Sequence, residues 1–440
     1  MKLQTLNFEF GISFPVVSRE KLERHLQHIW HQHLKQKGLL LEDDLIPIRQ
    51  GFLSFDGHMA RARNYVGFIQ VEDDYIEIYP KVFKGQDISK DEMLRHLFYW
   101  FDYCRKWRFP FSNVQLDSLD NIDLPELIIN LIANKIFEVI STSPISLYED
   151  VEEALLMPRG SINFSRYIQN SLSNGNFHVL ECDYEPLLYD NRLNKVIKYV
   201  SRILIGKSKV LETRRKLDDI LFILDDVEDC FCNSSMLSRI NINSFFSDYH
   251  TVLSLCKLVL DQQLYNNQYS EQDHWSLLLP MEYIFEDFIA GFLERHFSVE
   301  WEVHYQKSDL YLTDEGVFQM QHDIFLTAKE DSSVKIIIDT KYKVRNDLMI
   351  DQKKGVSQAD LYQMTSYAYR RGCNNVLLLY PNQTEVCSDI DSFTISSFDK
   401  HQQIKVYAAD VPFWSIQGSK NVTKLLRVRI EELLNAFKIK

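Results

Sequence analysis

The segment Lys335-Ile-Ile-Ile-Asp339-Thr340-Lys341 decides how the last third of the chain folds. Residues Val334–Thr340 form a short apolar run rich in β-branched side chains, which predicts a buried β-strand. Alternate residues of a strand point to the same side, so Asp339 and Lys341 should emerge together where this strand ends. A carboxylate and an ammonium beside an apolar core are costly to bury unless they have partners or a chemical function.

The sequence on both sides of this strand predicts a compact α/β domain over residues 276–440. Strands are expected at Gln319–Leu326 and Asn375–Tyr380, and helices at Met281–His296 and Gln358–Arg371. Ser357 is placed to cap the second helix and Gly372 to end it.

Two acids and a lysine from these elements suit phosphodiester hydrolysis. Asp323 interrupts the apolar strand Gln319–Leu326. Mg²⁺ takes hard oxygen ligands, commonly one or two carboxylates completed by waters and substrate phosphate, and Mn²⁺ can replace it. Asp323, Asp339 and the Thr340 backbone carbonyl are therefore the expected ligands, and Glu286 is a further candidate ligand. Lys341 is expected to act on the attacking water or on the developing negative charge.

Two helical positions are expected to complete this candidate site. Glu286 lies at the flank of the apolar stripe of the helix Met281–His296, where its side chain can point toward the strand ends. Gln363 and Tyr367 share a face of the later helix because they are four residues apart. Taken singly, each residue has an ordinary alternative: a strand-edge acid, a surface charge or a helix residue. Their order along the predicted elements favours a site.

The first two thirds of the chain predict two further regions. Residues 1–115 combine a helix at Arg19–Gln36 with a β-hairpin, Tyr65–Val71 and Tyr75–Tyr79, around an acidic turn. Residues 116–275 are expected to be mainly helical, and helices are predicted at Leu124–Ile140, Asn191–Ile205 and Phe246–Gln263, with breaks at Pro158–Gly160 and Asn170–Asn176. The polar stretch Asn267–Asp273 is a candidate domain boundary. The fold class is thus multidomain α/β.

Composition narrows the class of protein. With 45% hydrophobic residues among 440, the chain can form packed cores, and no stretch has the roughly 18 apolar residues of a membrane span. The N-terminus places Glu9 among apolar residues and makes a poor signal peptide. Seven scattered cysteines are expected to be reduced thiols, which favours a cytoplasmic protein.

Charge is distributed unevenly. The chain carries a net charge of -13, whereas the segment from Lys341 to Arg371 has seven basic residues against three acidic ones. Proteins that find double-stranded DNA unaided usually present a broad basic face, so this acidic chain is expected to be brought to DNA by a partner. The expected DNA contacts are Lys343, Arg345, Lys353, Lys354 and Tyr367.

Several short stretches resemble the McrC family, the nuclease subunits of McrBC-type modification-dependent restriction systems. They are Asn64–Gly67, Ile76–Lys81, Pro158–Gly160, Tyr189–Asn194, Met281–Phe288, Asp323, Ile338–Lys343 and Asp360–Met364. The resemblance implies a PD-(D/E)XK nuclease with Asp323, Asp339, Lys341, Glu286 and Gln363 at its site. His322 stands where the motif commonly has proline, and because the aspartate holds the metal, activity should survive this change.

The resemblance also implies a division of labour. A hexameric AAA+ GTPase of the McrB type is expected to bind GTP and to recruit this chain, whose N-terminal module stimulates nucleotide hydrolysis. No GxxxxGK[ST] phosphate loop occurs in the sequence, in agreement with a motor on another chain. Arg61, Arg63 and Lys81 lie in or near the predicted hairpin and are candidate contacts to the motor. The histidines from His25 to His33 more simply form a solvated helix than a metal site.

Two alternatives stay open at this point. One is a stand-alone restriction or repair endonuclease of the same fold, which would cut DNA without a motor. The other is a catalytically silent adaptor that only couples a motor to DNA. The sequence does not identify the modified base or the stoichiometry of the complex.

Overall fold

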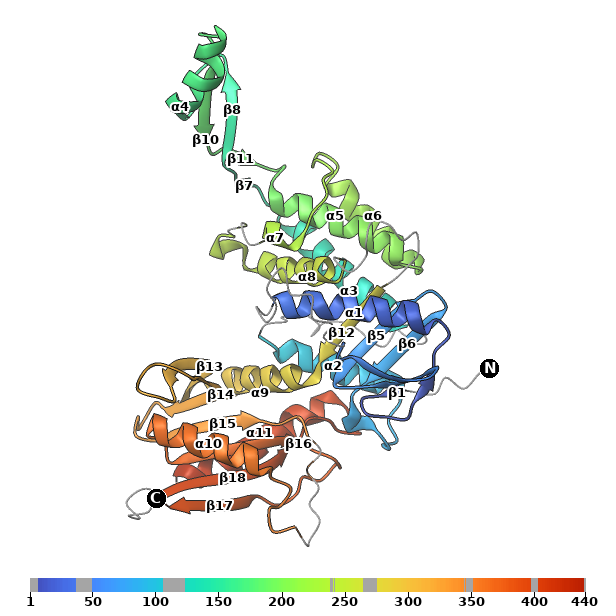
Figure 1. Cartoon of the computed structure of the whole chain (residues 1–440), viewed down its shortest axis with the longest axis vertical. Helices are drawn as coiled ribbons and strands as arrows, with labels where there is room; N and C mark the ends of the chain where they lie inside the picture. The colour runs from blue at the N-terminus through green and yellow to red at the C-terminus, as the bar shows by residue number, and fades with distance from the viewer. Residues whose placement is uncertain are drawn as a thin grey trace. The chain divides into compact units, whose positions relative to one another are not determined.

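The computed structural model describes residues 7–36, 50–105, 123–237, 240, 242–263, 275–343, 345, 351–396 and 403–438. The chain forms two compact units (Figure 1): Met1–Asp120 with Ser270–Lys440, and Asn121–Tyr269. The first unit thus joins both ends of the chain, and the second is inserted between them. The boundaries expected near residues 115 and 267–273 lie outside the described residues, and the division into 1–115, 116–275 and 276–440 stays a prediction.

The N-terminal sheet of the first unit contains the predicted hairpin. Strands β5 (Tyr65–Val71) and β6 (Asp74–Tyr79) pair antiparallel, and the sheet order is β1-β6-β5-β12. Strand β12 (Trp275–Pro280), which the sequence did not predict, pairs with β5 across Trp275↔Gln70. A Cβ at Gly67 would lie 1.9 Å from the Leu277 carbonyl oxygen, so glycine permits this close pairing.

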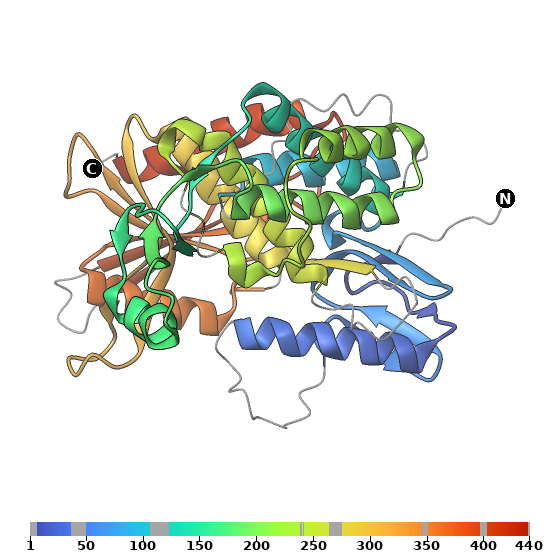
Figure 2. The ribbon, with the colours of Figure 1, turned by 90° about the horizontal axis from the view of Figure 1, so that it is seen from above.

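Helix α1 (Arg19–Gln36) has the predicted bounds and lies beside this sheet (Figure 2). Its Trp30 ring packs edge-on against Tyr65 of β5, with ring centroids 6.2 Å apart. His25 of the same helix is buried, and its Nε2 lies 2.9 Å from the Ser276 Oγ of β12. The histidine cluster therefore does not form a wholly solvated helix face, contrary to the expectation.

The second sheet of the first unit has six strands in the order β13-β14-β15-β16-β18-β17. The three predicted strands correspond to β14, β15 and β16, whereas β13, β17 and β18 were not predicted. Phe325 pairs with Ile337, and both pack against Met364 and Ala368 of helix α10. Asp323 lies two residues before Phe325 on its strand, and Asp339 lies two residues after Ile337 on the next. Because side chains alternate along a strand, both aspartates lie on the same face of the sheet as Phe325 and Ile337.

The second unit is helical over most of its length, as predicted, but it also contains strands. The region with the two predicted breaks forms a three-stranded sheet in the order β8-β10-β9. Short helical turns lie on the connection between β9 and β10. Propensity-based interpretation missed these strands because Val151–Leu155 and Leu180–Tyr184 are short and rich in acidic residues. We call residues 147–188 the hairpin arm.

The remaining elements complete the two units. The first unit also contains β1 (Asn7–Phe8), β2 (Phe14–Pro15), β3 (Leu53–Asp56), β4 (Met59–Ala62), η1 (Lys81–Phe83), α2 (Lys90–Tyr103), α9 (Met281–Phe297), β13 (Trp301–Tyr311), β14 (Gln319–Ala328), β15 (Lys335–Thr340), α10 (Gln358–Arg371), β16 (Asn375–Pro381), β17 (Asp391–Ser396), β18 (Gln403–Val411) and α11 (Ser419–Lys438). The second unit contains α3 (Leu124–Thr142), β7 (Leu147–Tyr148), β8 (Val151–Leu155), β9 (Ser161–Ile162), α4 (Phe164–Arg166), η4 (Tyr167–Ser171), η5 (Leu172–Asn174), β10 (Leu180–Tyr184), β11 (Leu187–Leu188), α5 (Arg192–Lys207), α6 (Leu211–Ile223), α7 (Ser234–Leu237), η6 (Ser244–Phe246) and α8 (Ser247–Gln263).

Two further expectations concern the whole chain. All seven cysteines are free thiols. Within the described ranges, no helix combines the length and the apolar character that a membrane crossing requires.

Candidate active site

Two carboxylates and a lysine meet at the carboxyl end of β15. The carboxylate of Asp323, on β14, accepts hydrogen bonds from the Thr340 backbone N–H at 2.8 Å and from the Thr340 hydroxyl at 3.0 Å. The Lys341 Nζ lies 2.7 Å from Oδ2 of Asp339. The spacing Asp339-Thr340-Lys341 thus places the ammonium beside the carboxylate, as the two-residue period predicts.

Burial disfavours the ionised form of both Asp323 and Asp339. Burial, and then the nearby charge of Asp323, raise the pKa of Asp339 to about 7. Burial also raises the pKa of Asp323, against the hydrogen bonds from Thr340. Burial disfavours the Lys341 ammonium, but its ion pair with Asp339 and the charges of Asp360 and Asp323 outweigh this effect and raise its pKa. The site therefore concentrates more negative charge than a single lysine balances.

The donor set fits a hard divalent cation. Because the nearby charge of Asp323 contributes to the raised pKa of Asp339, a cation bound between the two carboxylates would favour their ionised forms, and Mg²⁺ needs only one or two protein carboxylates. No group of three or more His, Cys, Asp or Glu side chains that could hold a metal occurs in the described part of the chain. A cation here would accordingly depend on Asp323, Asp339, a backbone carbonyl, water and substrate oxygens.

Asp360 is a site residue that sequence reasoning missed, because it was interpreted only as part of a helix cap. Ser357 caps α10 as predicted, since its side chain accepts from the Asp360 N–H. The Asp360 carboxylate lies 3.0 Å from the Nζ of Lys343 and 3.9 Å from that of Lys341. It therefore ties the start of α10 to both lysines that follow β15.

Glu286 is held by residues of β13. Its Oε1 accepts a hydrogen bond from Gln306 Nε2 at 3.0 Å. Tyr305 lies close by, since its pKa is raised by burial and then by the charges of Glu286, Asp287 and Asp323. The structure thus brings Glu286 to Gln306 and Tyr305, and Tyr305 lies within electrostatic range of Asp323. The role of Glu286 as a metal ligand stays a prediction. No sequence pattern pointed to Tyr305 or Gln306, because β13 was not predicted.

The face of α10 that carries Gln363 and Tyr367 forms as predicted. The Gln363 side-chain amide donates to the Tyr367 hydroxyl at 3.3 Å. The Tyr367 ring centroid lies 5.0 Å from that of His322, which is buried and precedes Asp323. Gln363 is exposed, and its described hydrogen bond is to Tyr367 and not to the aspartates. Burial lowers the pKa of His322, so this residue packs as a neutral ring.

The basic strip divides into exposed and buried members. Lys353 and Lys354 are exposed, as a DNA contact requires. Arg345 is 2% exposed, and its guanidinium lies 2.7 Å from Asp391 and 3.0 Å from Asp410. The DNA contact predicted for Arg345 does not agree with this position, because reaching a phosphate would break two buried ion pairs.

The three predicted motor contacts also differ in their exposure to solvent. Arg61 and Arg63 are exposed, and Arg61 donates to the Phe10 carbonyl at 3.1 Å. Lys81 is half-buried, and its Nζ donates to the backbone carbonyl of Tyr342 at 2.9 Å. Lys81 therefore contacts the segment next to Lys341 within its own unit, and its position does not favour a role as a free surface contact.

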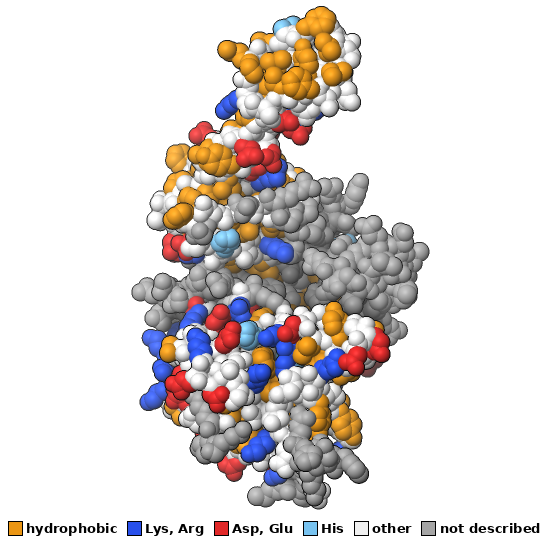
Figure 3. Space-filling view, turned by 90° about the vertical axis from the view of Figure 1, so that its left-hand side faces the viewer, with side chains coloured by type: hydrophobic (Ala, Val, Ile, Leu, Met, Phe, Trp, Pro, Cys, Tyr) orange, Lys and Arg blue, Asp and Glu red, His pale blue; other side chains and the backbone are white. Residues whose placement is uncertain are grey.

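The hairpin arm carries a cluster of exposed apolar side chains (Figure 3). The exposed fractions are 72% for Leu156, 77% for Met157, 67% for Phe164 and 65% for Phe177. Scattered exposed apolar residues are ordinary, but these four lie close together in sequence, in the connections and the short helix next to the strands β8, β9 and β10, and such clusters are typical of contact surfaces. Sequence reasoning missed this surface because Pro158–Gly160 was interpreted only as a break between helices.

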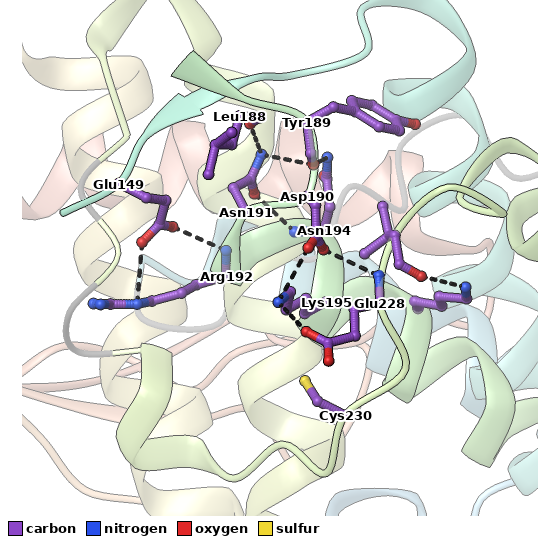
Figure 4. Close-up of polar contacts among 12 residues, drawn as sticks. Glu149, Leu188, Tyr189, Asp190, Asn191, Arg192, Asn194, Lys195, Glu228 and Cys230 are labelled. Atoms are coloured by element: carbon purple, nitrogen blue, oxygen red, sulfur yellow. Dashed lines mark hydrogen bonds and ion pairs between the residues drawn. The ribbon is translucent and has the colours of Figure 1, made fainter. Parts of the chain in front are cut away.

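A polar cluster fixes the base of the arm to α5 (Figure 4). The side-chain amide of Asn194 donates to the carbonyls of Ile145 and Tyr189 at 3.0 and 2.8 Å. Asn191 caps α5 by accepting from the Asn194 N–H at 3.0 Å. Glu149 accepts from the Arg192 N–H at 2.9 Å. These bonds join both strands of the base to one helix end, so the arm leaves the helices in a fixed direction.

Comparisons with known proteins agree with this architecture. The family described as McrBC 5-methylcytosine restriction system component matches residues 60–381. A chain from the structure of Thermococcus gammatolerans McrB AAA+ hexamers with bound McrC superposes with a TM-score of 0.62 at 16% identity, covering 96% of this chain and 99% of that chain. The structure of the Thermococcus gammatolerans McrBC complex gives a TM-score of 0.47 at 18% identity, covering 66% of this chain and 87% of that one. No curated protein matches.

Proposed function

Since the chain belongs to the McrC family of McrBC 5-methylcytosine restriction system components, we propose that it is a DNA endonuclease subunit, recruited by a McrB-type AAA+ GTPase. The observation that carries the nuclease proposal is the cluster of Asp323, Asp339 and Lys341 at the end of β15. Two buried carboxylates beside an ammonium form an arrangement that folding alone does not favour, because their mutual repulsion costs stability. The six-stranded sheet between α9 and α10 is, in this proposal, a PD-(D/E)XK nuclease core.

Asp323 and Asp339 would hold Mg²⁺, with the Thr340 carbonyl as a further ligand. When bound, the ion polarises a phosphoryl oxygen and lowers the pKa of water. Lys341 orients the attacking water or donates a hydrogen bond to the charge that develops on phosphate, since its ammonium already lies at the Asp339 carboxylate. Asp360 holds Lys341 and Lys343 near the site, because its carboxylate attracts both ammoniums and offsets their repulsion.

Glu286, Gln363 and Tyr367 take outer positions in this proposal. Glu286 orients Tyr305 and Gln306, and Gln363 with Tyr367 faces incoming DNA from α10. Lys353 and Lys354 supply exposed positive charge for the phosphate backbone. Since the chain carries a net charge of -13, stable DNA binding depends on the partner.

We propose the hairpin arm as the motor contact, in place of the N-terminal module (residues 1–115) with Arg61, Arg63 and Lys81, where the resemblance led us to expect it. The related chain of Thermococcus gammatolerans is bound to McrB AAA+ hexamers, and in this chain the arm offers an apolar surface of the kind that protein partners bury. Phe164 and Phe177 are its largest side chains, and the Asn191 cluster at its base keeps its direction fixed. GTP then belongs to the partner, and the arm stimulates the motor by docking in it.

The nuclease proposal is tested by Mg²⁺-dependent cleavage of double-stranded DNA by the full chain assembled with its McrB-type partner. Asp339→Ala and Lys341→Ala are expected to abolish cleavage without unfolding the protein. Asp389→Ala and Lys335→Ala serve as matched controls, because both lie in the same unit away from the cluster. Normal cleavage by Asp339→Ala would remove the proposal.

Two outcomes separate the alternatives. Full cleavage by the chain without a motor favours a stand-alone endonuclease. Absence of Mn²⁺ binding, measured by calorimetry on the wild-type chain, favours a catalytically silent adaptor.

A further inference from the structure

The residue that follows Lys341 is held by the N-terminal part of the chain. The Tyr342 hydroxyl donates to Oε2 of Glu9 at 2.9 Å, and the Tyr342 carbonyl accepts from the Nζ of Lys81 at 2.9 Å. The same Nζ lies 4.2 Å from the centroid of the Tyr342 ring, a cation–π distance. Both ends of one residue are thus fixed by two residues that lie more than 250 positions away in sequence.

Glu9 and Lys81 are themselves held in place by adjoining strands. Glu9 directly follows β1, its N–H donates to the Tyr79 carbonyl at 3.0 Å, and its Oε2 also accepts from the Lys81 N–H at 3.0 Å. Lys81 follows β6 after Pro80. Because β1 and β6 pair in parallel, their carboxyl ends meet at one edge of the N-terminal sheet, and Tyr342 docks there.

Lys341 consequently lies between two anchors. On one side its own N–H donates to the Leu379 carbonyl of β16 at 2.8 Å. On the other side is Tyr342, which is 2% exposed and packs near Phe285 and Phe413 at 6.2 Å each. The N–H of Lys341 pairs with β16, and the backbone on its other side is held through Tyr342. These two anchors set the backbone position from which the Lys341 ammonium reaches Asp339.

Packing alone does not explain a glutamate at position 9. It is fully buried, its Oε1 accepts no hydrogen bond from a described residue, and burial raises its pKa to about 7. An apolar residue at this position would pack with less cost in free energy. The presence of a glutamate in the apolar stretch Asn7–Phe14 is explained by the hydrogen bonds through which its Oε2 holds Lys81 and Tyr342.

We propose that Glu9 and Lys81 are positioning residues of the nuclease, which hold Lys341 in its working position through Tyr342. This inference rests on the proposed nuclease function and adds that the N-terminal sheet is part of the scaffold of the site. A displacement of that sheet is transmitted to Lys341 through Tyr342.

The test uses single-turnover cleavage by the full chain assembled with its McrB-type partner, titrated in DNA. Lys81→Met keeps the apolar stem and removes the ammonium, and Glu9→Ala removes the accepting oxygen. Each is expected to lower kcat by roughly 10- to 100-fold, the scale of a displacement of about 1 Å, with KM for DNA changed less than about twofold. The matched controls Lys84→Met and Glu20→Ala, at exposed positions, should keep the wild-type kcat.

Conservative variants and metal binding distinguish positioning from a structural role. Lys81→Arg and Glu9→Gln keep the donor and the acceptor, and they are expected to restore kcat to within about threefold. Mn²⁺ affinity of the full chain should stay within about twofold in every variant, because Asp323 and Asp339 are untouched.

Wild-type kcat in Lys81→Met and Glu9→Ala overturns the inference and leaves the nuclease proposal intact. Loss of Mn²⁺ affinity together with kcat also overturns it, because the whole site would then have collapsed. Normal cleavage by Asp339→Ala instead removes the nuclease proposal itself.

Discussion

Asp339→Asn is expected to stabilise the metal-free protein while destroying its activity. Asparagine has the shape of the protonated acid, so it removes only the charge. The pKa of Asp339 is raised from 3.8 to about 7 by burial and by Asp323. At about 1.36 kcal/mol for each pKa unit, ionising this group in the folded protein costs up to about 4 kcal/mol relative to the unfolded chain. The lost contact to Lys341 reduces the net gain to roughly 1–3 kcal/mol.

The sign of the pH dependence follows from the raised pKa. The folded state binds the proton more tightly than the unfolded state, so the contribution of Asp339 to stability is greatest below pH 3.8. That contribution is lost as pH rises to about 7 and changes little above it. The difference in unfolding free energy between Asp339→Asn and the wild type should therefore grow between about pH 4 and pH 7. Glu9, whose pKa is also about 7, is the same in both proteins and cancels.

Scanning calorimetry of both proteins in EDTA, from pH 5 to pH 8, measures this difference. A gain of 1–3 kcal/mol corresponds to a melting temperature higher by roughly 2–5 °C. Mn²⁺ should then stabilise the wild type and leave Asp339→Asn unchanged, since a ligand stabilises only the state that binds it. A difference that is independent of pH, or a variant less stable than the wild type at pH 8, would refute the argument that the ionised Asp339 carboxylate destabilises the metal-free protein.

Three further predictions concern other parts of the chain. Arg345→Met should lower the unfolding free energy by about 3–5 kcal/mol, measured by denaturation, because it removes the buried guanidinium that pairs with Asp391 and with the buried Asp410. Substituting Phe164 and Phe177 by Ser should weaken motor binding by at least about tenfold and leave the melting temperature unchanged, and unaltered stimulation of GTP hydrolysis would exclude the arm as the contact. Replacing Lys353 and Lys354 by Gln should reduce the salt slope of DNA binding by about 1.8, whereas an unchanged slope would place the DNA elsewhere.

Local sequence patterns predicted the elements that carry the site. The bounds of β15 and α10, the cap at Ser357, and the shared side of Asp339 and Lys341 all follow from periodicity and capping within about fifteen residues. These features depend on neighbours in sequence, so one sequence suffices to predict them.

Contacts over long sequence distances could not be predicted in this way. Arg345 was counted as surface charge because nothing near it in sequence shows that Asp391 and Asp410 enclose it. Glu9 served only as evidence against a signal peptide, whereas it is buried against Tyr342. The hairpin arm was missed for another reason: its apolar side chains point outward, which inverts the pattern that hydrophobic periodicity detects.

The pairing of β12 with β5 has a consequence for synthesis on the ribosome. Gln70 is made about two hundred residues before its partner Trp275, which at 5–20 residues per second is a wait of roughly 10–40 s. Throughout that time one edge of β5 has unpaired backbone groups and the apolar side chains of Val66 and Phe68 without their cover, the conditions under which strands of nascent chains pair with each other. The inserted unit, which emerges in the interval, thus lengthens the period in which this edge of the N-terminal sheet stays unpaired and open to other strands.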